Sequence, residues 1–113
     1  MLSFLRKLMA GVPSITVDQL DELLHQDAVR LIDVREESEF RGGHVPGAVN
    51  IPKGKLGQRL EKLKKDKPYA VICASGSRSM GATGQLLEAG FEGTVSVSGG
   101  TSAWARSGRV VKR

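Results

Sequence analysis

The chain contains a single cysteine, and the residues around Cys73 suit a reactive thiol. Cys73 closes an apolar run over residues 69–73, and a turn of small residues leads from it into an amphipathic stretch over residues 80–89. A buried strand that runs through such a turn into a helix directs backbone N–H groups and the positive end of the helix dipole at the turn. With the guanidinium of Arg78 nearby, these groups favour thiolate over thiol. We therefore predict that Cys73 is a nucleophile; the alternative is a small buried hydrophobe at the end of a strand.

Short apolar strands and amphipathic helices alternate along the chain, and this pattern predicts a parallel sheet. The expected strands cover Ile15 and residues 29–34, 48–51, 69–73 and 93–97. The expected helices cover residues 16–26, opened by a capping box at Thr16, then 36–41, 56–63 and 80–89, and a last helix capped by Thr101. Such a sheet is covered on both faces, and its sites form at the carboxyl ends of the strands, where Cys73 lies.

Length and composition indicate one domain. At 113 residues with 40% apolar content, the chain can bury a core without disulfides or metal. The lone cysteine favours a reducing compartment, the cytoplasm. Cys73, His25 and His44 lack the spacing of zinc ligands, so we expect no metal and no cofactor. No apolar run is long enough for a transmembrane segment. We expect a short N-terminal helix or frayed arm over residues 1–12, with docking to a partner or membrane surface left open, and a single domain over 13–113.

Basic residues are concentrated in one segment of a chain whose net charge is +5. Residues 53–67 contain Lys53, Lys55, Arg59, Lys62, Lys64, Lys65 and Lys67. No aromatic stacking platform accompanies them, so we expect no nucleic-acid partner. The simplest interpretation is a solvated helix surface, and the alternative is a surface that attracts anionic substrates or an acidic protein.

Several motifs that occur in one order resemble those of the single-domain rhodanese-like sulfurtransferase family. They are Leu31-Ile32-Asp33-Val34-Arg35, Glu39-Phe40, Gly43-His44-Val45-Pro46-Gly47-Ala48-Val49-Asn50-Ile51-Pro52, Cys73 with its loop, and Gly99-Gly100 followed by Trp104. The resemblance covers residues 14–108 and implies an α/β, three-layer domain with a central, mainly parallel five-stranded sheet and helices on both faces. It also implies a sulfurtransferase that carries a sulfane sulfur as a persulfide on Cys73. The donor would be thiosulfate or another persulfide, and the thiophilic acceptor cyanide or a thiol.

The loop after Cys73 suits this chemistry, because sulfur transfer needs a thiolate nucleophile and then a stabilised terminal sulfur anion. The expected active-site loop is Ala74, Ser75, Gly76, Ser77, Arg78 and Ser79. Its amides would surround the anion like an oxyanion hole, its serines could add hydroxyl donors, and Gly76 permits a positive φ. Arg78 would bind an anionic donor through two contacts. The alternatives are solvent-facing turn residues for Ser75 and Ser77 and a surface ion pair for Arg78.

Loop length separates this interpretation from phosphate chemistry. Four residues lie between Cys73 and Arg78, one fewer than in tyrosine-type phosphatases and in the phosphatases that share the rhodanese fold. A smaller loop suits one sulfur atom better than a tetrahedral oxyanion, so a phosphatase or arsenate reductase is the less favoured function. Many family members carry a basic residue directly after the cysteine, where this chain has Ala74. A loop with one charge favours a persulfide donor over dianionic thiosulfate.

Further polar residues are expected beside the Cys73 loop. We expect Asp33 to form a structural ion pair, and Arg35 either to share in such pairing or to bind substrate. Glu39 is interpreted as a helix-surface charge, with a place at the mouth of the site as the alternative. His44 is expected to hold a turn by hydrogen bonds, near the site but outside the chemistry.

A function of a different class stays open on the same residues. The domain could be a persulfide carrier or protein-interaction module without turnover on small molecules. Both functions need a reactive Cys73, so the cysteine does not discriminate them. The basic segment would suit docking of an acidic sulfur-relay protein.

Overall fold

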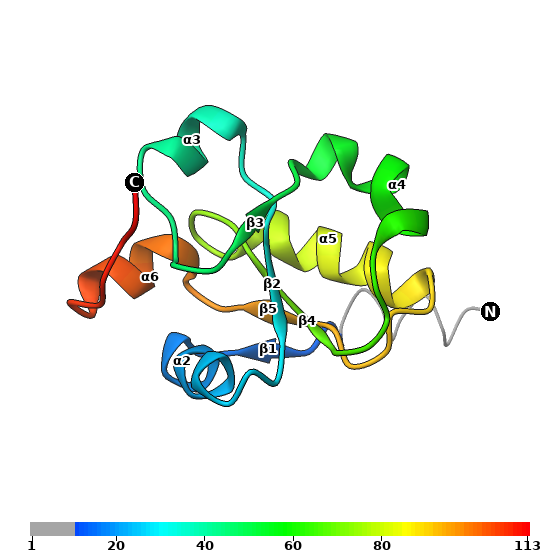
Figure 1. Cartoon of the computed structure of the whole chain (residues 1–113), viewed down its shortest axis with the longest axis horizontal. Coiled ribbons are helices and arrows are strands. Elements are labelled where there is room, and N and C mark those ends of the chain that lie inside the picture. The colour runs from blue at the N-terminus through cyan, green and yellow to red at the C-terminus, as the bar shows by residue number, and fades with distance from the viewer. Residues whose placement is uncertain (1–10) are drawn as a thin grey trace.

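The computed structural model describes residues 11–113 and places five strands in one sheet with helices on both faces (Figure 1). The strands are β1 (Ser14–Ile15), β2 (Arg30–Asp33), β3 (Val49–Asn50), β4 (Tyr69–Ile72) and β5 (Val95–Val97). Their order is β1-β5-β4-β2-β3, and every pairing is parallel. The predicted three-layer α/β architecture is therefore confirmed. Because β4 lies between β5 and β2, the chain that leaves β4 is flanked by the carboxyl ends of both neighbours.

The helices are α2 (Val17–His25), α3 (Glu37–Arg41), α4 (Leu56–Arg59), α5 (Ser77–Glu88) and α6 (Gly100–Arg106), with 3-10 turns at Lys53–Lys55 and Leu60–Lys62. The predicted capping box opens α2: Gln19 N–H donates to Thr16 Oγ1 over 3.1 Å, and Thr16 N–H donates to Gln19 Oε1 over 2.9 Å. In Figure 1, α4 and α5 lie on one side of the sheet, with α2 and α6 on the other.

Several element boundaries differ from the sequence-based expectation, each for a local reason. The helix expected over residues 56–63 breaks into α4 and a 3-10 turn, because Gly57 weakens it and no side chain caps its start. The helix expected from Met80 already begins at Ser77. Thr101 does not cap α6: it lies inside the helix, and Gly99, with a left-handed φ of 77°, occupies the cap.

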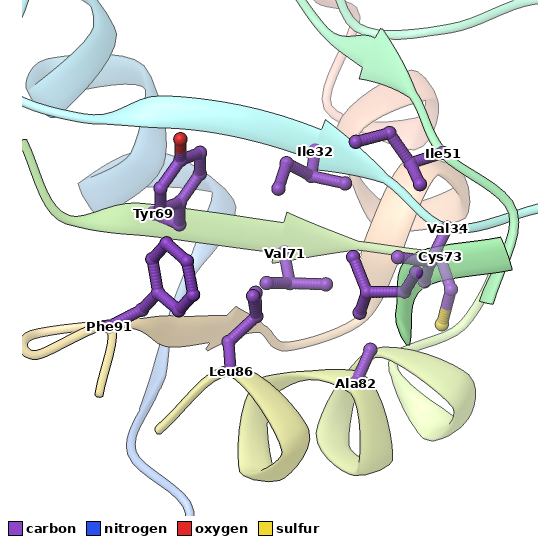
Figure 2. Close-up of a cluster of buried hydrophobic side chains, with 10 residues drawn as sticks. Ile32, Val34, Ile51, Tyr69, Val71, Cys73, Ala82, Leu86 and Phe91 are labelled. Atoms are coloured by element: carbon purple, nitrogen blue, oxygen red, sulfur yellow. The ribbon is translucent and has the colours of Figure 1, made fainter. Parts of the chain in front are cut away.

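Two apolar clusters hold the layers together, one on each face of the sheet. Successive residues of β4 and the cysteine that follows it alternate between the two clusters: Val71 and Cys73 pack toward α5, while Ala70 and Ile72 pack toward α2 and α6. Figure 2 shows the first cluster, with Leu86 and Ala82 of α5 facing Val71 and its neighbours. Burying each large apolar side chain in this way stabilises the fold by roughly 1.5–3 kcal/mol. The central strand is therefore a rigid support for the residue at its end.

Trp104 is buried at 4% exposure in the second cluster. The short helix or frayed arm expected over residues 1–12 falls almost wholly on residues 1–10, outside the described residues. Within residues 11–113, no helix combines the length and apolar character needed to cross a membrane.

Candidate active site

Cys73 lies directly after β4, and its thiol is turned into a short loop that leads to α5. The side chain is 1% exposed and ends the apolar cluster beside Val34 (Figure 2). Gly76 makes the tight loop possible, because it adopts a φ of 105° and serves as the cap of α5. A Cβ at this glycine would also lie 3.2 Å from the amide nitrogen of Gly99. The loop therefore needs glycine both for its backbone conformation and for its close approach to the turn before α6.

Three hydrogen-bonding groups of the protein surround the sulfur. The amide of Gly76 donates to Cys73 Sγ over 3.1 Å, and the amide of Ser79 donates over 3.3 Å. The Ser79 hydroxyl oxygen lies 3.5 Å from the sulfur, where it accepts from the thiol or donates to the thiolate. Backbone amides in this arrangement stabilise an anion at a site from which water is largely excluded.

These contacts shift the pKa of the thiol. Burial raises the pKa of Cys73, but the hydrogen bonds from the Ser79 hydroxyl and from the amides of Ser79, Gly76 and Ser75 lower it by more. The net result is a pKa below the ordinary value for cysteine. Cys73 is thus held in a setting that favours the nucleophilic thiolate.

Behind the sulfur, a buried hydroxyl pair connects the loop to β5. While Cys73 is a thiol, Ser79 Oγ donates its single hydrogen to the carbonyl oxygen of Gly76 over 3.0 Å; when Cys73 is a thiolate, that hydrogen can turn to the sulfur instead. Ser79 Oγ also lies 2.8 Å from Ser96 Oγ. Ser79 and Ser96 are at most 1% exposed. Ser96 is not among the residues that the sequence predicted for the site; its only local signal is a serine between two valines in a strand that is covered on both faces. Such a buried hydroxyl needs a partner, and here the partner is Ser79.

The first turn of α6 holds the start of the loop from the other side. Thr101 N–H donates to the carbonyl oxygen of Cys73 over 2.9 Å, and Ser102 N–H donates to that of Ala74 over 3.0 Å. Gly100 allows this approach, because a Cβ at Gly100 would collide with both carbonyl groups. Gly99, the cap of α6, and Gly100, its first residue, therefore serve the geometry of the Cys73 loop.

Arg78 is not free in this structure. Its Nη1 and Nη2 donate to the two carboxylate oxygens of Glu39 over 2.8 and 3.0 Å. The two side chains are 38% and 36% exposed, so the pair lies at the rim of the loop and not beneath the sulfur. The ion pair that the sequence left as an alternative for Arg78 is present, and its partner comes from α3, far away in the sequence.

The family model described as the rhodanese-like domain matches residues 16–107. The chain belongs to the rhodanese-like domain family.

Relatives and solved structures agree with this assignment. The chain is 44% identical over 94 residues to the Bacillus subtilis (strain 168) protein named "Putative sulfurtransferase YtwF", covering 82% of this chain and 90% of that protein. It is 32% identical over 96 residues to the thiosulfate sulfurtransferase GlpE of Shewanella oneidensis, covering 85% and 95%. A crystal structure of a rhodanese-related protein from Thermoplasma volcanium superimposes with a TM-score of 0.80 at 36% identity, covering 88% of this chain and 97% of the other.

In this rhodanese-like domain, Asp33 and Arg35 form a second, buried ion pair beside the loop. Arg35 Nη2 and Nε donate to the Asp33 carboxylate over 2.8 to 3.1 Å, and Nη2 also donates to the carbonyl oxygen of Gly43 over 2.7 Å. The Arg35 side chain is 8% exposed and that of Asp33 is not exposed. Asn50 donates to the carbonyl oxygens of Asp33 and Arg35 over 3.0 and 2.9 Å. These contacts tie the carboxyl end of β2 to β3 and α3; a role of Arg35 in binding substrate stays a prediction.

His44 lies in the turn that follows α3. Its Nδ1 donates to the carbonyl oxygen of Phe40 over 2.8 Å, and its ring stacks on the Phe40 ring with centroids 3.8 Å apart. Its backbone exchanges two hydrogen bonds with Lys112. All these contacts hold the turn and the C-terminal segment.

Two expected donors do not contact the sulfur. Ser75 and Ser77 are exposed, and for neither does a hydroxyl hydrogen bond to Cys73 exist in the structure; only the Ser75 amide influences the thiol. Ala74 is half-buried and lines a cavity of about 280 Å³ together with Arg35, Thr101 and Arg113. Among the described residues, no group of three or more His, Cys, Asp or Glu side chains could hold a metal ion.

Proposed function

We propose that this rhodanese-like domain is a sulfurtransferase that carries a sulfane sulfur as a persulfide on Cys73. The observation that carries the proposal is the set of two amides and one hydroxyl within 3.5 Å of the only sulfhydryl in the chain. Two of the compared relatives bear sulfurtransferase names, which supports the same reaction class. A thiol that must stay reduced to act also suits a reducing compartment, the cytoplasm.

In the first half-reaction, the Cys73 thiolate attacks the outer sulfur of the donor. A sulfur–sulfur bond forms to Cys73 while the bond between the outer sulfur and the rest of the donor breaks, and the leaving group keeps the electron pair. With thiosulfate the leaving group is sulfite, and with a persulfide it is a thiolate. The lowered pKa of Cys73 raises the fraction of thiolate that can attack.

In the second half-reaction, a thiophilic acceptor attacks the terminal sulfur of the Cys73 persulfide. Cyanide becomes thiocyanate, or a thiolate becomes a new persulfide, and the Cys73 thiolate leaves with its electron pair. The amides of Gly76 and Ser79 would stabilise the negative sulfur in each stage, since they point to the place where charge resides.

A second candidate function, a carrier that exchanges sulfur with other proteins, is favoured by the basic surface. Within residues 11–113, Lys67 pairs with Asp27, whereas no carboxylate lies within ion-pair distance of Lys53, Lys55, Arg59, Lys62, Lys64 or Lys65. Residues 1–10 contain no Asp or Glu that could pair with them. An acidic sulfur-relay protein would meet uncompensated positive charge on this surface.

The experiment that tests the proposed reaction has two readouts. Wild-type protein is incubated with thiosulfate or a low-molecular-weight persulfide, and intact-mass measurement detects the addition of one sulfur atom. Cyanide is then added, and thiocyanate turnover is measured. A sulfur adduct with turnover supports the enzyme, an adduct without turnover supports the carrier, and the absence of an adduct with both donors contradicts both functions.

A further inference from the structure

Two arginines beside the Cys73 loop, Arg35 and Arg78, are each paired with a carboxylate. Arg35 forms an ion pair with buried Asp33, and Arg78 forms an ion pair with Glu39 through two hydrogen bonds. Ala74 adds no charge at the position after the cysteine. The thiolate itself is negative when it attacks. A donor that approaches the loop therefore meets no net positive charge from these two ion pairs.

Glu39 is firmly held in this position. Its Oε1 accepts from the amide of Glu36 over 3.0 Å, in the capping box that opens α3, as well as from Arg78 over 2.8 Å. The hydrogen bond from Arg78 and that from the Glu36 amide lower the pKa of the carboxyl to about 2. Glu39 thus carries a full negative charge at any pH at which Cys73 reacts, and α3 presents that charge to the guanidinium that would otherwise attract an anion.

We propose that Glu39 determines donor specificity in this site: by pairing with Arg78 it disfavours dianionic sulfur donors and favours donors with one negative charge or none. This inference rests on the proposed sulfur transfer but concerns a residue outside the loop that performs it. The physical reason is that the electrostatic work of bringing an anionic donor to the thiolate increases with the charge of the donor. The positive charge of Arg78 would reduce this work, and Glu39 cancels that charge.

Two donors that differ by one charge test the proposal. Thiosulfate is a dianion and methanethiosulfonate is a monoanion. With both, the Cys73 thiolate takes the outer sulfur; the bond to the oxidised sulfur breaks, and sulfite or methanesulfinate leaves with the electron pair. In Glu39→Gln, we expect the ratio of kcat/KM for thiosulfate to that for methanethiosulfonate to rise about three- to tenfold, as for removal of one partly screened charge.

Glutamine is the right replacement because it removes the charge and keeps one of the two acceptor oxygens; the bond that Arg78 Nη2 donates to Oε2 is lost. Its amide oxygen can still accept from the Glu36 amide, which preserves the capping box of α3. The matched control is Glu37→Gln on the same helix, since Glu37 pairs with Arg41 over 3.3 Å and both of these side chains are mostly exposed. The control removes an equal charge away from Arg78, and we expect the donor ratio to stay at the wild-type value.

A second readout does not depend on sulfur transfer. Iodoacetate and iodoacetamide alkylate a thiolate by the same displacement of iodide, but the first reagent is an anion and the second is neutral. In Glu39→Gln, the ratio of the alkylation rates of Cys73 by iodoacetate and iodoacetamide should rise about two- to fivefold, and the rise should shrink in high salt.

The two readouts separate the possible failures. The absence of sulfur transfer from both donors in the wild type would contradict the proposed function. The ratio of the iodoacetate and iodoacetamide rates would still decide the role of Glu39. An alkylation ratio unchanged in Glu39→Gln, or raised equally in Glu37→Gln, would overturn the inference. A wild-type protein that already prefers the dianion, with no change on substitution, would overturn it as well.

Discussion

The inner side of the Cys73 loop contains buried, uncharged hydrogen-bond donors, whereas its outer side carries charged groups that are partly exposed. On the inner side, the amides of Gly76 and Ser79 lie 3.1 and 3.3 Å from the sulfur, and the Ser79–Ser96 hydroxyl pair lies behind them. On the outer side, Arg78 pairs with Glu39. The two sides respond to negative charge in different ways.

The difference follows from solvent exposure and from what holds each group in place. The inner donors belong to the backbone and to side chains of no more than 1% exposure, so salt does not screen them and they are already oriented. The outer ion pair is screened, and its contribution to stability is small. The inner side is therefore suited to create the reactive sulfur, and the outer side to select what reaches it.

The most severe test removes the sulfur itself. Cys73→Ser should abolish both the sulfur adduct and thiocyanate turnover, because a serine hydroxyl is not ionised at neutral pH and forms no persulfide. Intact-mass measurement after exposure to donor checks this outcome. A sulfur adduct on the variant, in a chain with no second cysteine, would show that the inner side of the loop is not the reactive site.

Ser79→Ala weakens the inner side without removing the thiol. We expect transfer to slow about ten- to a hundredfold, because one donor to the developing anion is lost. The pKa of Cys73 should also rise, since the Ser79 hydroxyl is one of the groups that lower it. Alkylation rate against pH measures this shift. Ser77→Ala, which removes an exposed hydroxyl of the same loop, should have a much smaller effect on the midpoint; equal shifts would contradict the assignment.

Arg78→Ala tests the outer side. The substitution leaves the Glu39 carboxylate uncompensated, so dianionic thiosulfate should react about tenfold more slowly, and methanethiosulfonate only about threefold more slowly. The pH midpoint of Cys73 alkylation should move less than in Ser79→Ala. Initial rates with both donors at two salt concentrations check this. A large pH shift with equal losses for both donors would mean that Arg78 acts on the inner side of the loop.

Ser96→Ala should produce a smaller change through Ser79. Ser96 does not contact the sulfur, so it is a positioning residue: its loss lets the Ser79 hydroxyl reorient and leaves that group without one partner. We expect the pKa of Cys73 to rise by less than in Ser79→Ala, and the rate of sulfur transfer to fall two- to fivefold. The free energy of unfolding should fall by about 1 kcal/mol. Ser98→Ala is the control, because Ser98 is exposed on the same segment. Equal pKa shifts in the two variants would exclude the proposed connection.

The smallest expected effect concerns the stability of the outer pair. The pKa of Glu39 is lowered from 4.5 to about 2, so its pairing stabilises the fold above the unfolded pKa and loses this contribution as pH falls through the folded pKa. Because both side chains are partly exposed, the gap in unfolding free energy between wild type and Glu39→Gln should stay below about 1 kcal/mol at pH 7. It should narrow between pH 4.5 and 2. Urea unfolding across this range measures it, and a gap that widens on acidification would contradict the pairing.

Local patterns in the sequence were sufficient for the fold class and for the position of Cys73. The alternation of apolar strands with amphipathic helices predicted the parallel sheet, and the capping box at Thr16 predicted the start of α2. The small residues between β4 and α5 predicted a loop that aims amides at the cysteine, because this depends only on residues close together in the chain. Gly76 and the amide of Ser79 are in that segment.

Only the tertiary structure decided which distant residues complete the site. Glu39 contacts Arg78 because α3 follows β2, which lies on one side of β4. Ser96 contacts Ser79 because β5 lies on the other side of β4. The sequence predicted that Thr101 caps α6. In the structure Thr101 lies in the first turn of that helix, and its amide donates to the carbonyl oxygen of Cys73. The periodicity of apolar residues indicates on which face of its own helix or strand a residue lies, whereas these contacts depend on strand order and register. The sequence by itself therefore determined where the cysteine and the amides around it lie, and the packing of the sheet decided which charged groups surround them.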